Sequence, residues 1–204
     1  LNENNIPLAI HAIGDNAVNA ALNSFEKMGL IGVGNRIEHI EVISPEDIER
    51  FKNLEIYPSM QPNHGTGVIG KYIEERIGAR DEFSYMWFSL NEGSGNRLLL
   101  GSDWPTAPLS PLVQLADAVL RTSPYGLYQG VWFPKEALGL EDAIKSYTLL
   151  PAIAAGIDNE VGSIVVGKQA DFVILDGPLT IDNLKTINID ATYLAGKLTY
   201  KKND

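Results

Sequence analysis

The first hundred residues repeat one pattern, in which a short apolar run is followed by a polar turn and an amphipathic segment. Ile6 to Ile13 is strand-like, and a helix with Asp15 as its N-cap follows, because apolar residues recur at helical spacing from Ala17 to Met28. Parallel strands need a long crossover connection, which is usually a helix. The pattern therefore predicts an α/β fold with a parallel sheet, either doubly wound or a barrel.

The same pattern recurs three more times. A strand at 35–43 precedes a helix with Ser44 as N-cap, Pro45 at its first position and Asp47 in a capping-box-like pattern. A strand at 54–62 precedes a helix at 70–78, and a strand at 96–105 precedes a helix at 111–121. The last of these strands is almost continuously apolar, as is typical of a parallel sheet covered on both faces.

The pattern changes after residue 121. Residues 140–156 are predicted to form a last helix, and beyond Gly156 the sequence consists of short alternating runs separated by glycines. We therefore expect an α/β domain at residues 1–157 and, at residues 158–204, strands of a small β-sandwich or an edge sheet.

The composition limits the ligands of this chain. A formal net charge of -10 disfavours binding to nucleic acid or to an anionic membrane, which leaves a small molecule as the expected partner. No apolar run approaches the roughly 20 residues of a membrane span. The chain contains no cysteine, so a metal ion must be held by His, Asp, Glu or a modified Lys.

The beginning of the chain indicates a longer parent protein. It opens on Leu1, enters a strand within a few residues, and shows neither a charged targeting region nor a cleavage site. We expect a fragment or a processed piece. Its compartment does not follow from the sequence, although a cytoplasmic location is favoured.

All three histidines of the chain follow predicted strands. The steps are 28 residues from His11 to His39, 25 from His39 to His64, and 39 from His64 to Asp103. Each step has about the length of one βα unit, and the third step includes a longer connection. Each residue is therefore expected to lie at the same edge of a parallel sheet, where active sites are built. Imidazoles and a carboxylate on one rim suit zinc or a similar divalent ion, whereas a single histidine is more often a satisfied core imidazole.

Several neighbouring residues have two interpretations. Asp103 either caps the next helix or, as we favour because Pro105 and Pro108 delay that helix, contacts a metal and takes a proton from water. Asp15 either caps a helix or supports His11, and Glu38 either forms a buried ion pair with Arg36 or supports the ligands.

Aromatic residues gather near the last two predicted strands. Trp104 and its neighbours Trp87 and Trp132 either line an apolar substrate pocket or pack between the two domains, and packing is at least as well supported for Trp87 and Trp132.

Five motifs occur in a familiar order: HAIGDNAV, RIEHIE, SMQPNH, GSDWP and GKQADFVILD. Together they resemble the C-terminal half of the amidohydrolase superfamily, in particular the amidohydrolase-3 branch that contains N-substituted formamide deformylase-like enzymes. The resemblance covers nearly the whole chain. It implies strands five to eight of a metal-dependent (β/α)8 TIM-like barrel, with part of a small β-sandwich.

The resemblance also implies roles for single residues. His11 and His39 would be metal ligands, Asp103 would bind metal and act as general base, and His64 would face the substrate, with Trp104 nearby. One or two ions, most often zinc, would act on non-peptide carbon-nitrogen bonds through an activated water. Deamination and ester hydrolysis on the same scaffold are alternatives, as is a non-catalytic binding or assembly module.

This chain differs from the family pattern because it lacks the motifs of the first four barrel strands. The His-x-His motif of strand one and the bridging residue of strand four do not occur in this chain. Four βα units cannot close an eight-stranded barrel, so we expect either the N-terminal half of the same protein or a second copy as a partner. The chain alone is expected to bind metal weakly and to be poorly active.

Overall fold

The computed structural model describes residues 6–29, 31–32, 34–123 and 130–203. Its first sheet contains four strands, β1 (Ala9–Ala12), β2 (Arg36–His39), β3 (Tyr57–Met60) and β4 (Leu99–Leu100). All neighbouring strands pair in parallel in the order β1-β2-β3-β4. The predicted parallel α/β fold is confirmed, and the order of the strands in the sheet follows their order in the chain.

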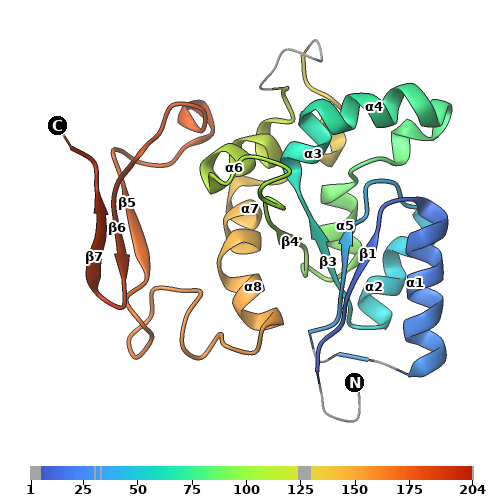
Figure 1. Ribbon diagram of the computed structural model, residues 1–204, viewed down its shortest axis with the longest axis horizontal. Helices are drawn as coiled ribbons and strands as arrows, with labels where there is room; N and C mark the ends of the chain where they lie inside the picture. The colour runs from blue at the N-terminus through green and yellow to red at the C-terminus, as the bar shows by residue number, and fades with distance from the viewer. Residues whose placement is uncertain (1–5, 30, 33, 124–129, 204) are drawn as a thin grey trace.

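Helices connect these strands and follow the last of them. They are α1 (Asp15–Met28), η2 (Pro45–Asp47), α2 (Ile48–Asn53), α3 (Pro62–Thr66), α4 (Val68–Ile77), η3 (Gly78–Phe83), α5 (Trp87–Gly93), α6 (Pro111–Leu120), η4 (Pro134–Glu136), α7 (Leu140–Tyr147) and α8 (Leu149–Ala154). Figure 1 shows α1 and α2 on one side of the sheet, with α6, α7 and α8 beyond β4. Within the described residues, no helix combines the length and the apolar character that a membrane crossing needs.

The core lies on one face of the parallel sheet. Alternate side chains of the strands, Ala12, Ile37 and Met60, are almost fully buried among apolar side chains of the helices. On the opposite face, His11 is exposed, and Arg36 and Glu38 are half-buried. The sheet is therefore apolar toward its helices and carries polar side chains on the other face at β1 and β2.

Two local predictions are wrong. The single helix expected at 140–156 is divided at Thr148, whose backbone (φ -127, ψ -79) separates α7 from α8. Asp15 is the first residue of α1 and Gly14 is its N-cap.

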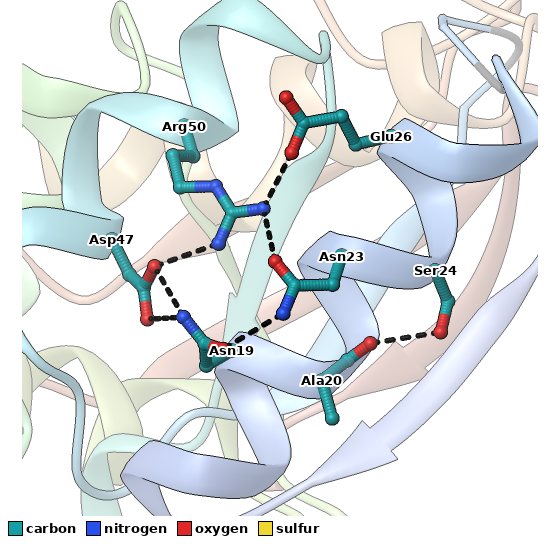
Figure 2. A network of polar contacts seen from close by, with 7 residues as sticks. All are labelled: Asn19, Ala20, Asn23, Ser24, Glu26, Asp47 and Arg50. Atoms are coloured by element: carbon teal, nitrogen blue, oxygen red, sulfur yellow. Dashed lines mark hydrogen bonds and ion pairs between the residues drawn. The ribbon is translucent and has the colours of Figure 1, made fainter.

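Asp47 makes long-range contacts in place of a capping box. Its carboxylate accepts hydrogen bonds from Asn19 of α1 and from Arg50 of α2, and Arg50 also contacts Asn23 and Glu26 (Figure 2). The Asp47 side chain is 2% exposed. This network holds the first two crossover helices together.

An aromatic cage surrounds a buried arginine beyond the carboxyl end of the sheet. The Arg121 guanidinium lies 4.1 Å from the Trp87 ring centroid and 4.9 Å from that of Trp132. It donates hydrogen bonds to the backbone carbonyls of Trp132 and Tyr85. Trp87 and Trp132 are buried, and they pack on Arg121 and on the ring of Tyr85, all within residues 1–157.

The C-terminal part contains a second sheet. Its strands β5 (Phe172–Leu175), β6 (Ile189–Leu194) and β7 (Lys197–Lys201) pair antiparallel in that order, and η5 (Ile181–Asn183) lies between β5 and β6. In Figure 1 this sheet lies on the far side of α6 and α7 from the parallel sheet. Within the described residues this is a single three-stranded sheet, and the sandwich expected from the sequence stays a prediction.

Candidate metal centre

The four residues singled out by their spacing all lie at the carboxyl ends of the parallel strands. His11 is in β1, His39 is the last residue of β2, His64 is in α3 directly after β3, and Asp103 follows β4. The expectation that one βα step returns each residue to the same edge is met.

Three of these residues form a close group. One potential ligand atom from each of His39, His64 and Asp103 lies within 4.8 Å of the others. The ring of His64 stacks on that of His39 with 5.9 Å between centroids. His11 lies beside the group, with its ring centroid 4.4 Å from that of His39. The structure thus places His64, expected to face the substrate, among the potential ligands.

The backbone at this rim adopts a conformation that few residues take. His39, Ile40 and Asp103 have φ angles of 79°, 48° and 55°. Such left-handed conformations cost of the order of 1–3 kcal/mol for residues other than glycine, and they gather at functional sites. Asp103 does not cap the next helix, because α6 begins at Pro111 with Ser110 as its N-cap.

Gln61 orients His39. The Oε1 atom of this buried side chain lies 3.0 Å from Nδ1 of His39. An amide oxygen only accepts hydrogen bonds, so this contact is a hydrogen bond when the ring proton of His39 is on Nδ1, which leaves the lone pair of Nε2 available. Gln61 was missed in the sequence, although it lies in the SMQPNH motif three residues before His64.

Glu41 is a second residue that the sequence did not single out. Its Oε1 lies 3.4 Å from Nδ1 of His64, while Nε2 of His64 lies 3.8 Å from Oδ2 of Asp103. His64 is 3% exposed, and neither ring nitrogen makes a hydrogen bond within the described part of the chain. A buried polar group of this kind calls for a ligand or partner, so His64 is the member of the group most in need of one.

Helix α6 fixes the position of α3. The Gln114 side chain accepts a hydrogen bond from the backbone N–H of Asn63, and Asp117 accepts one from the Asn63 side chain at 2.7 Å. Gln114 and Asp117 are both buried. Burial raises the pKa of Asp117 to about 6, an effect that its hydrogen bonds with Asn63 and Thr66 partly oppose.

The predicted supporting residues have other partners. Asp15 accepts hydrogen bonds from the backbone N–H of Asn16 and from Arg80, which occupy both carboxylate oxygens, and these interactions hold its pKa below the usual range. Glu38 pairs with Arg36 as expected, but the two side chains are 23% and 40% exposed, so the ion pair is not buried.

Glu38 and Trp104, which the sequence analysis also singled out, lie near the rim. In the β1–β2 register, Glu38 is opposite His11. Trp104, next to Asp103, is 64% exposed.

The donor set fits a divalent cation. His39 offers Nε2, the buried nitrogens of His64 make no hydrogen bond within the residues that the structure describes, and Asp103 adds a carboxylate at the same point. Two imidazoles and one carboxylate are a donor set that catalytic divalent-metal sites use. The arrangement defines a candidate metal centre at the carboxyl edge of a parallel sheet.

Comparison with known proteins places this chain in a class. A metal-dependent hydrolase from Pyrococcus horikoshii OT3 superposes with a TM-score of 0.68 over 81% of this chain and 32% of its own, at 31% identity. The fold is therefore similar to that of a metal-dependent hydrolase. The model of the amidohydrolase family matches residues 1–200, and the chain belongs to that family.

Two curated relatives match almost the whole chain. LONG AFTER FAR-RED 3 of Arabidopsis thaliana is 34% identical over 96% of this chain and 34% of its own length. N-substituted formamide deformylase of Arthrobacter pascens is 29% identical over 97% of this chain and 37% of its own length. The chain thus spans little more than a third of these relatives.

Proposed function

We propose that the protein of which this chain is part hydrolyses non-peptide carbon-nitrogen bonds, in amides or N-substituted formamides. The observation that carries the proposal is the convergence of His39, His64 and Asp103 within 4.8 Å at the rim of the sheet. The similarity to N-substituted formamide deformylase supports the substrate class. Water adds to the carbonyl carbon, the carbon-nitrogen bond breaks, and a carboxylic acid and an amine leave.

Zinc is the ion that we propose for the centre. Imidazole nitrogens with one carboxylate oxygen are a common catalytic zinc donor set. When bound, a divalent ion polarises a carbonyl group and lowers the pKa of water, which is the chemistry that amide hydrolysis needs. His39, with its ring proton directed at Gln61, and His11 beside it are the residues proposed to hold the ion or ions together with Asp103.

Asp103 is the proposed general base. Its side chain is 43% exposed, so a water molecule reaches it from the open side of the rim. The carboxylate takes the proton of the attacking water and passes it to the leaving nitrogen. Trp104 follows in the chain and offers an exposed apolar surface next to the carboxylate for the organic part of the substrate.

His64 has two possible roles that require opposite proton positions. To polarise the substrate carbonyl, its Nε2 atom must carry a proton and donate a hydrogen bond. To hold the cation, the same atom must present a lone pair. The rim geometry is compatible with either role, and the position of the ring proton decides between them.

The complete site requires more protein than this chain. We propose that the four parallel strands are half of a (β/α)8 barrel and that β5–β7 are one layer of a sandwich. The sequential strand order and the polar, open face of the sheet at Arg36 and Glu38 support this proposal. The other strands would come from the same protein or from a second copy.

The test uses the intact protein loaded with zinc. We expect it to release amine and formate in equal amounts from an N-substituted formamide, and we expect Asp103→Asn to lower kcat by roughly 10²–10⁴-fold. Matched substrates separate the alternatives: ammonia from an aminated heterocycle indicates a deaminase, and alcohol from the corresponding ester indicates an esterase. An intact protein without a divalent ion, whose activity is unchanged by His11→Ala and Asp103→Asn, would contradict the proposal.

A further inference from the structure

Glu41 is held rigidly next to the candidate metal centre. It follows the carboxyl end of β2 by two residues, and its carbonyl accepts a hydrogen bond from the backbone N–H of Tyr85 at 2.9 Å. The next residue, Val42, forms an antiparallel bridge with Ser84. The backbone of Glu41 is therefore fixed to the segment that leads into the aromatic cage.

The Glu41 side chain faces one nitrogen of His64. Its Oε1 lies 3.4 Å from Nδ1, and the two side chains are 5% and 3% exposed. On the other side of the ring, Nε2 lies 3.8 Å from Oδ2 of Asp103, whose side chain is 43% exposed. His64 thus lies between a buried carboxylate and a solvated one.

The difference in burial decides where the ring proton belongs. A buried carboxylate without a hydrogen-bond donor loses most of its hydration and is costly, whereas a half-exposed one is stabilised by water. A neutral imidazole has a single N–H to donate and one lone pair. The desolvation of the Glu41 carboxylate costs more than that of Asp103, so a hydrogen bond from Nδ1 to Glu41 stabilises the folded protein more. The lone pair of His64 is then on Nε2.

We propose that Glu41 is a positioning residue that keeps the ring proton of His64 on Nδ1 and so presents the Nε2 lone pair to the rim at Asp103. A lone pair and a carboxylate oxygen 3.8 Å apart suit a shared cation. His64 is then a cation donor and not the group that polarises the substrate carbonyl. The catalytic consequence rests on the proposed function, but the proton position does not.

Nitrogen-15 NMR of the intact, metal-free protein with labelled histidine rings tests the proton position directly. The His64 signals are assigned by their absence from His64→Gln. We expect the Nδ1 shift to be that of a protonated nitrogen and the Nε2 shift to be that of an unprotonated one. The opposite pattern in the unmutated protein overturns the proposal without recourse to any variant of Glu41.

Substitution of Glu41 tests whether this residue keeps the ring proton of His64 on Nδ1. Glu41→Met keeps an unbranched side chain but removes the acceptor, so Asp103 becomes the nearest carboxylate and the proton moves to Nε2. Glu136→Met is the matched control, because Glu136 is also a buried glutamate but bonds Ser89. An unchanged His64 spectrum in a folded Glu41→Met protein contradicts the proposal.

Zinc binding gives a second readout that does not depend on catalysis. Loss of residues that orient a metal ligand typically lowers metal affinity 10–100-fold, and we expect this loss for Glu41→Met but not for Glu136→Met. If the loaded protein hydrolyses no amide while the NMR and zinc results are as expected, the proposed function fails and the role of Glu41 stands. Equal zinc affinity of wild type and Glu41→Met overturns that role.

Discussion

The rings of His11 and His39 meet edge to face, with 4.4 Å between their centroids and 65° between their planes. They come from neighbouring strands, where Ala12, one residue after His11, is the partner of His39 in the register. The left-handed backbone at His39 departs from the extended conformation of the strand. Two imidazoles that the chain separates by 28 residues thus become one surface of the candidate centre.

The first prediction concerns these two rings. His11→Asn and His39→Asn each remove an imidazole from the centre, so each is expected to weaken zinc binding by the intact protein more than the 10–100-fold typical of supporting residues. Titration against a zinc indicator measures the affinity. Asn16→Ala, on the exposed surface at the start of α1, serves as control. Wild-type affinity in both histidine variants would remove them from the ligand set.

The second prediction concerns the buried Asp47 carboxylate. Asp47→Ala leaves Arg50 and Asn19 without their partner, and we expect the free energy of unfolding to fall by about 3 kcal/mol. Glu26→Gln is the control on the same arginine, because the Glu26 side chain is 65% exposed and exposed ion pairs contribute below about 1 kcal/mol. Urea denaturation compares the two, and equal losses would show that burial of Asp47 is unimportant.

The third prediction concerns Gly65, next to His64 in α3. A Cβ atom at this position would lie 3.0 Å from Tyr85, 3.1 Å from Trp87 and 3.2 Å from Trp132. These rings are packed around Arg121 and have little room to move, so Gly65→Ala is expected to cost about 1–3 kcal/mol and to weaken zinc binding by displacing His64. Gly177→Ala, where a Cβ meets nothing within 4 Å, should change neither quantity.

The fourth prediction concerns the pH dependence of stability. Burial raises the pKa of Asp117 from 3.8 to about 6, so between these values the folded protein binds more protons than the unfolded chain. Stability due to this group is complete below pH 3.8 and is lost as the pH rises through 6, by about 3 kcal/mol in total. The unfolding free energy of wild type should therefore fall relative to Asp117→Asn between pH 4 and pH 7.

The control for this prediction is an exposed carboxylate. Asp182 lies on the surface at η5, so Asp182→Asn should follow the wild-type pH profile. Parallel profiles for wild type and Asp117→Asn would show that the carboxylate of Asp117 is not desolvated in solution.

Local patterns predicted much of this molecule because they report periodicity and spacing. The four βα units, α6 at its predicted position and the return of His11, His39, His64 and Asp103 to one edge of the sheet all follow from strand and helix periods. Helix ends were less accurate. The division at Thr148 and the cap at Gly14 depend on single backbone conformations, which apolar periodicity does not encode.

By itself, the sequence determined which residues gather at the rim and which metal chemistry they suit, because crossover length and donor type are properties of the chain. Only the tertiary structure decided how they are held. Glu41 and Gln61 face histidines that lie 22 or 23 residues away, and Asp15 pairs with Arg80. These contacts depend on burial and on left-handed backbone turns at the strand ends, which arise only when the strands and helices pack together.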